Sequence, residues 1–147
     1  MDEDFVDVCF KMIDGKLGSL KFEKKATVVT YAVPLTYGGY RIKFSGEGLV
    51  DLSGAHRLTE KYGDKIKVYP ASMELKDGKT YALKSRGVAV VGMGESISEA
   101  REISLEGVRN IDGPLWNRWD IGSEKHIERS ILHMKRLREE GSRGCSK

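Results

Sequence analysis

The sequence has few of the residues and motifs that mark several common protein classes. Its 147 residues include two cysteines, Cys9 and Cys145, near opposite ends of the chain, with no CxxC spacing and no histidine ligands close by. Thiols placed in this way indicate neither a disulfide scaffold nor a zinc site. We interpret Cys9 as a small buried apolar side chain and Cys145 as part of a disordered tail.

Long apolar runs and a basic leader are also missing. No window approaches the roughly 18 consecutive apolar residues that a membrane span needs. The acidic start, MDED, is the opposite of the basic n-region of a signal peptide. We therefore expect a cytoplasmic protein that has no membrane partner. With 39% hydrophobic residues, the chain is long enough to form one domain around its own core.

Motifs for hydrolases, metal centres and phosphate loops are absent from the sequence. It contains no GxSxG, HExxH or P-loop, and His126 and His133 are too far apart on a helix to chelate one ion, so we predict no metal site. The stretch VAVVGMGES has the first two glycines of GxGxxG, but Ile97 replaces the third. Glu95 and Glu99 also place negative charge where an anion would bind. We interpret these glycines as a structural turn.

Local patterns in the first half of the chain predict a helix followed by a strand. Residues 2–14 combine an acidic start with apolar residues at helical spacing, and Gly15 follows in the position typical of a helix end. The β-branched run ATVVTYAV predicts a strand at residues 26–33, which Pro34 ends. Three weaker patterns predict a short strand within a loop (residues 40–44), another short strand (residues 49–52) and a polar helical turn (residues 56–62).

The second half of the chain carries the clearest local patterns. Asp77 and Gly78 form a favoured type I′ turn between two alternating segments, which predicts a β-hairpin. An apolar strand is expected at residues 88–91, followed by a helix that starts with a Ser96–Glu99 capping box. A last helix should run from Ser123 to about Glu140. This order of elements predicts an α+β fold with a small, mostly antiparallel sheet and flanking helices.

These segments together resemble the C-terminal part of phosphoribosylamine–glycine ligase, an ATP-grasp enzyme of purine biosynthesis. The resemblance runs in order from DFVDVCFKMIDGKL through ATVVTYAVP and VYPASMELKDGKTYALKSRGVAVVGMGESISEA to RWDIG and the helix after it. The YAVP stretch and the long basic terminal helix are similar to archaeal members. The resemblance implies a fold like that of the C-terminal domain of biotin carboxylase. It assigns residues 1–24 to a leading helix and linker, 1–140 to one domain and 141–147 to a flexible tail.

The resemblance also implies partners and cofactors outside this sequence. In the family, this domain packs against the N-terminal and ATP-grasp domains, and an upstream region binds ATP and magnesium. We therefore expect the chain to be inactive by itself, with no catalytic residue of its own, and to act with those domains on the same or a separate chain.

Two positions are candidates for substrate contact by this resemblance. Arg86 precedes the apolar strand, where its guanidinium could reach an anionic ligand; a solvated edge arginine is an equal alternative. Tyr37 matches a family tyrosine in a loop that would face substrate. The sequence departs from the family beside both residues, with Lys84 and Ser85 where glycines are common, and with Gly38 where proline is common.

The segment GPLWNRWDIG contains both tryptophans of the chain. We expect Trp116 and Trp119 to anchor this connection on the sheet, and Arg118 and Asp120 to tie its turn. The alternative is that the two tryptophans form an exposed patch for docking the missing domains.

A second functional hypothesis concerns the basic last helix. The chain could be a stand-alone binding module that uses this helix on an acidic partner or RNA. Glu139 and Glu140 interrupt the basic run and no aromatic platform accompanies it, so the pattern favours a solvated helix face over a nucleic-acid site.

Overall fold

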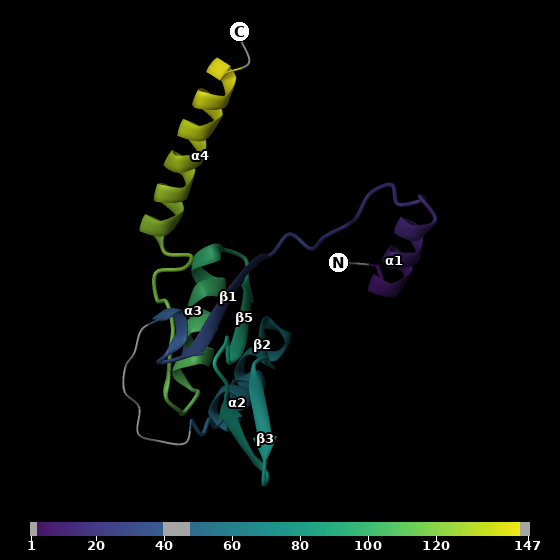
Figure 1. Ribbon diagram of the computed structural model, residues 1–147. Helices are drawn as coiled ribbons and strands as arrows, with labels where there is room; N and C mark the ends of the chain where they lie inside the picture. Colours follow the sequence, from purple (N-terminus) through teal and green to yellow (C-terminus); the bar gives the residue numbers. More distant parts are fainter. Residues whose placement is uncertain (1–2, 40–47, 145–147) are drawn as a thin grey trace.

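The computed structural model describes residues 3–39 and 48–144, and it confirms the predicted α+β class (Figure 1). A four-stranded antiparallel sheet has the order β2-β5-β1-β6, and a separate hairpin pairs β3 with β4. The strands are β1 (Ala26–Pro34), β2 (Ile66–Pro70), β3 (Met73–Lys76), β4 (Lys79–Ala82), β5 (Val88–Gly94) and β6 (Leu115–Trp116). The helices are α1 (Phe5–Ile13), α2 (Ser53–Tyr62), α3 (Ile97–Arg109) and α4 (Glu124–Gly144), with 3-10 turns at Tyr37–Gly39 and Gly63–Lys65.

The core lies between the sheet and two helices. Helix α3 packs across β1 and β5, and α2 packs against α3 and β2. In β1, alternate residues point to this core, so Val28, Thr30 and Ala32 are buried while the residues between them are exposed. The predicted strand at 26–33 is thus confirmed. The central buried cluster also includes Val50, Leu52, Ile66, Val88, Val90, Ile103 and Val108.

The glycines of VAVVGMGES lie in a strand, so our interpretation of them as a turn was wrong. Gly92 and Gly94 belong to β5, which lies directly under α3. A Cβ atom on Gly92 would collide with the carbonyl oxygen of Ala100 and lie 2.6 Å from the amide nitrogen of Ser104. Glycine at this position therefore lets the helix approach the strand closely.

The predicted capping box at the start of α3 is present in part, because the Glu99 side chain bonds to a different backbone amide from the one expected. The Ser96 hydroxyl accepts a hydrogen bond from the Glu99 amide at 3.1 Å, as a capping box requires. The Glu99 carboxylate accepts instead from the Glu95 amide at 2.8 Å. The cap therefore fixes both the helix and the residue that leads into it.

The β3–β4 hairpin has the predicted turn. Asp77 has φ 50° and Gly78 has φ 72°, and both values belong to the left-handed region that a type I′ turn needs. Residues 49–52, predicted as a strand, instead make two isolated bridges, from Leu49 to Tyr81 and from Asp51 to Asp112. The predicted short strand at residues 40–44 lies outside the described residues.

Helices α1 and α4 extend away from the sheet and its two packed helices (Figure 1). Asp4 caps α1 by accepting from the Val6 amide at 2.8 Å. Val8 is the buried residue of this helix, whereas Phe5, Phe10 and Ile13 are exposed. Within the described ranges, none of the helices is both apolar enough and long enough to cross a lipid bilayer.

Two sequence-based expectations differ in detail from the structure. Cys9 is only half-buried in α1, so it is less enclosed than we expected, and Cys145 lies outside the described residues. Helix α4 starts after Ser123 as predicted and continues to Gly144, beyond the expected end near Glu140.

Candidate functional site

A cavity of about 260 Å³ lies between the free edge of β1 and the connection from β6 to α4. The sequence singled out six residues as candidate site or anchor residues. Four of these six line the cavity: Tyr37, Arg86, Trp116 and Arg118. They come from segments up to about eighty positions apart in the chain, and the sheet brings them together. Tyr31, which the sequence analysis did not single out, forms part of the same wall.

The edge of β1 supplies backbone groups to this cavity. The Ala32 carbonyl accepts from the Gly87 amide at 3.1 Å, on the side toward β5. Because backbone groups alternate along a strand, those of Val29 and Tyr31 point to the opposite edge, where both residues line the cavity. In the described part of the chain, this edge has a strand partner only where β6 meets the end of β1. The cavity therefore combines aromatic walls with a stretch of β1 that has no strand partner among the described residues.

Arg86 is held at the rim of the cavity by an aromatic ring. Its guanidinium carbon lies 5.1 Å from the centroid of the Tyr31 ring, in a cation–π arrangement. The Arg86 side chain is exposed, and its backbone carbonyl accepts from the Ser72 amide at 2.9 Å, which fixes the segment before β5. The guanidinium is thus placed where it can meet an anionic group entering the cavity.

Tyr37 enters the cavity from a tight turn after β1. The next residue, Gly38, has φ 72°, which is in the left-handed region. Proline, which the resemblance leads one to expect at this position, has φ fixed near −65° and cannot adopt this conformation. The glycine therefore gives the turn a backbone path that a proline-containing loop could not follow.

The predicted pair between Arg118 and Asp120 is present and has two hydrogen bonds. Nε of Arg118 lies 2.9 Å from Oδ1 of Asp120, and Nη2 lies 2.6 Å from Oδ2. Hydrogen bonding to the guanidinium lowers the pKa of Asp120 to about 2. The contact uses one edge of the guanidinium, so the Nη1 donors remain on the other side of the group.

The two tryptophans have different environments. Trp116 is half-buried in β6, pairs with Val33 and forms one wall of the cavity. Trp119 is 73% exposed, so the expectation that its ring is a buried anchor was wrong. Its backbone carbonyl does tie the connection to α3, by accepting from Nη2 of Arg101 at 2.7 Å. The exposed ring agrees with the alternative of a docking patch.

Three archaeal proteins named phosphoribosylamine–glycine ligase match nearly the whole chain. The Methanocella arvoryzae protein is 38% identical over 137 residues, which make up 92% of this chain and 29% of the relative. The Methanosarcina barkeri protein is 38% identical over 140 residues, or 94% of this chain and 30% of the relative. The Methanococcus maripaludis protein is 37% identical over 136 residues, which make up 91% of this chain and 29% of the relative. This chain is homologous to one part of phosphoribosylamine–glycine ligase. No family model matches it.

The homology confirms the resemblance predicted from the sequence, including its archaeal character. The chain spans about 29% of the length of the ligases it matches, so more than two thirds of each ligase lies outside the match. Tyr31 and the edge of β1 were not predicted to be parts of the cavity. Tyr31 could have been found from the alternation in ATVVTYAV, because that pattern places it opposite the core.

Proposed function

We propose that this chain supplies the C-terminal part of a phosphoribosylamine–glycine ligase, which joins glycine to 5-phosphoribosylamine at the expense of ATP. The observation that carries the proposal is the match over 92% of this chain to 29% of an archaeal ligase. The N-terminal and ATP-grasp domains would then be its partners, on the same or a separate chain in the cytoplasm. ATP and magnesium would bind to those domains, and no catalytic residue is assigned to this chain.

The cavity beside β1 is the proposed point of substrate contact. Arg86 offers a planar set of N–H donors at the rim, suited to the phosphate of 5-phosphoribosylamine. The hydroxyl of Tyr37 can donate to or accept from the same ligand. Arg118 adds a second guanidinium, although Asp120 neutralises much of its charge. The rim therefore carries a net positive charge next to aromatic walls.

The test is ADP release with phosphoribosylamine, glycine and Mg-ATP. It is run on this chain alone and on a mixture with the Methanosarcina barkeri ligase from which the matching part has been removed. We expect activity only in the mixture, because positioning of phosphates and metal needs the ATP-grasp part. No activity in a mixture whose truncated ligase is folded and binds ATP would overturn the proposal.

The exposed position of α4 favours the stand-alone binding module as a second candidate. This helix extends away from the sheet (Figure 1). It carries exposed basic residues, including Lys135, Arg136 and Arg138. An RNA affinity that falls with salt and disappears when these three become Glu would support this candidate. Binding that is absent or independent of salt would remove it.

A further inference from the structure

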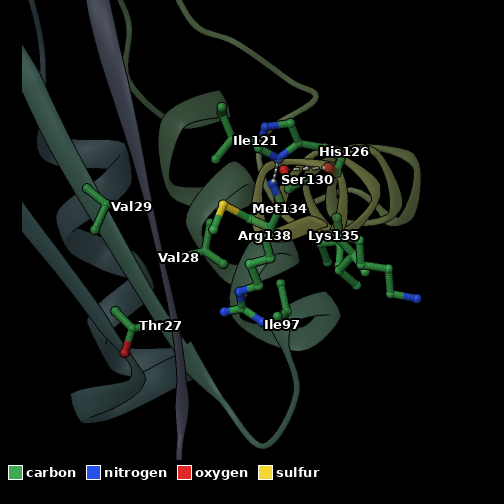
Figure 2. A pocket seen from close by; sticks show the side chains of 13 residues that line it. Thr27, Val28, Val29, Ile97, Ile121, His126, Ser130, Met134, Lys135 and Arg138 are labelled. Carbon is green, nitrogen blue, oxygen red and sulfur yellow. Dashed lines mark hydrogen bonds between the residues drawn. The ribbon is translucent and has the colours of Figure 1, made fainter. Parts of the chain in front are cut away.

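Two hollows border helix α4. One is a mainly apolar groove of about 620 Å³ between α4 and β1, where Met134 of α4 points across the space toward Val28 of β1 (Figure 2). The other has a volume of about 690 Å³ and lies between α4 and the connection from β6, residues 117–123. Trp119 of the connection and Leu132 of α4 form part of its lining. We refer to this second space as the Trp119 hollow.

The Trp119 hollow exposes two large apolar side chains. Trp119 is 73% exposed and Leu132 is 67% exposed. A tryptophan ring buries about 150–250 Å² when another molecule covers it, and the removal of that apolar surface from water stabilises the complex. Tryptophan is also one of the residue types enriched among those that dominate binding at protein interfaces. The exposed ring is therefore suited to anchor another molecule.

The backbone that carries the Trp119 ring is fixed on both sides. The Trp119 carbonyl accepts from Nη2 of Arg101 on α3 at 2.7 Å. The Asp120 carbonyl accepts from the Ser123 amide at 3.0 Å, and the Asp120 carboxylate holds Arg118 by two hydrogen bonds. Because the ring projects from a backbone whose position is already set, a partner that receives it does not have to order a loop first.

The charges around the Trp119 hollow have both signs. Lys125 and Arg129 of α4 are basic, Glu128 is acidic, and all three are exposed and line the hollow. A polyanion such as RNA, or an anionic membrane, is attracted by a surface of one sign. An apolar centre inside a rim of mixed polar groups is instead typical of a protein–protein interface. The chemistry of the hollow therefore fits a protein partner.

The Trp119 hollow and the cavity beside β1 meet at one ion pair. Arg118 lines the cavity, Asp120 lines the hollow, and hydrogen bonds of 2.9 and 2.6 Å join their side chains. A molecule seated on Trp119 therefore lies next to the rim at which the substrate is proposed to bind. The rest of the ligase has to reach this rim, because the proposed function assigns to it the ATP with which the substrate reacts.

We propose that the Trp119 hollow is the surface on which the rest of the ligase docks, with the Trp119 ring inserted into an apolar pocket of that partner. This inference rests on the proposed function. It also draws on the extent of the homology, because more than two thirds of each matching ligase lies outside the match. The exposed indole and the rim of both signs define the segment that fits, an apolar pocket flanked by acidic and basic side chains.

The first experiment follows the Trp119 ring directly. The chain is labelled with 5-fluorotryptophan, which gives one fluorine NMR signal for each of its two tryptophans, and the Trp119→Phe variant assigns them. The unlabelled truncated Methanosarcina barkeri ligase described above is added together with a soluble paramagnetic agent that broadens the signals of exposed rings. We expect the Trp119 signal to be broadened in the free chain and protected in the complex.

Titration calorimetry with the same partner measures what the side chains contribute. Trp119→Ala should weaken binding at least about tenfold, and Leu132→Ala at least about threefold. Leu137→Ala is the matched control, because Leu137 is also an exposed leucine of α4 but does not line the hollow. It should change the affinity by less than about twofold. Circular dichroism and the melting temperature establish that each variant keeps its fold.

Binding in which the Trp119 signal stays broadened, or in which Trp119→Ala binds as tightly as Leu137→Ala, would overturn this docking surface and leave the proposed function standing. Protection of the Trp119 signal in the chain alone as its concentration rises would identify a second copy as the occupant and would also overturn the proposal. No binding by the unmodified chain to a folded, ATP-binding truncated ligase would count against the proposed function itself, and the docking proposal would fall with it.

Discussion

The hydroxyl groups of Ser104 and Thr30 lie 2.8 Å apart inside the core, joining helix α3 to strand β1. The Ser104 oxygen also lies 2.8 Å from the carbonyl oxygen of Val90 in β5. A hydroxyl has one proton, so Ser104 donates to Val90 and accepts from Thr30. This arrangement satisfies both buried side chains and ties one helix position to two strands.

Replacing Ser104 with alanine should destabilise the fold by about 1–3 kcal/mol, because the Thr30 hydroxyl would be left buried without its partner. The double variant Ser104→Ala with Thr30→Val should recover much of that loss, since both hydroxyls are then gone. Urea unfolding measures both effects. Ser130→Ala, on the exposed helix α4, is the control and should change stability by less than about 0.5 kcal/mol. A double variant no more stable than Ser104→Ala would contradict the assignment.

Replacing Gly92 with alanine should prevent stable folding or cost more than about 3 kcal/mol, as overpacking against a helix backbone does. The added Cβ would meet the Ala100 carbonyl and the Ser104 amide, and backbone atoms cannot move aside as a side chain can. A Cβ added at Gly141 in α4 would instead meet nothing within 4 Å. Gly141→Ala should therefore stabilise slightly, by up to about 1 kcal/mol. Thermal unfolding of both variants provides the comparison.

The ion pair between Arg118 and Asp120 should contribute to acid sensitivity. The pKa of Asp120 is lowered from 3.8 to about 2, so its contribution to stability is fully present above pH 3.8 and is lost as the pH falls through about 2. Replacing Arg118 with glutamine should return the pKa of Asp120 toward 3.8. A carboxyl-detected NMR titration measures this pKa directly. An unchanged Asp120 pKa in the variant would show that the guanidinium is not its cause.

Replacing Arg86 with glutamine should raise the KM for phosphoribosylamine in the mixture with the truncated ligase by roughly ten- to a hundredfold, the scale of one charge-assisted hydrogen bond. The KM for ATP should change little, because ATP is assigned to the other domains. Arg57→Gln on α2 is the matched control, since Arg57 is exposed and does not line the cavity. Equal KM values for phosphoribosylamine in the two variants would remove Arg86 from substrate contact.

Much of the secondary structure could be predicted from sequence because its determinants are local. Asp77 and Gly78 favour a turn with two positive φ values whatever lies around them. Ser96 caps α3 through a contact three residues away. The predicted strand at 49–52 failed because isolated bridges to Tyr81 and Asp112 depend on distant segments.

The candidate site could be predicted only as separate residues. Arg86, Tyr37 and Arg118 were each singled out, but no spacing in the sequence indicated that they share one cavity. Their meeting depends on the strand order β2-β5-β1-β6, which places the segment before β5 and the connection after β6 beside β1. The exposure of Trp119 is decided in the same way, because a large aromatic ring is buried only where other elements cover it.

The sequence by itself determined the helices α1, α3 and α4, the strands β1 and β5, the β3–β4 hairpin, the turn and cap residues, and the homology to part of the ligase. The secondary structure follows from periodicity and backbone preferences, which act over a few positions. The homology follows from residue identity, which can be compared directly with other sequences. Only the tertiary structure decided that Gly92 serves helix packing, that four chosen residues line one cavity, and that α4 leaves an apolar groove beside β1. Each of these depends on contacts between segments far apart in the chain, and local preferences do not specify such contacts.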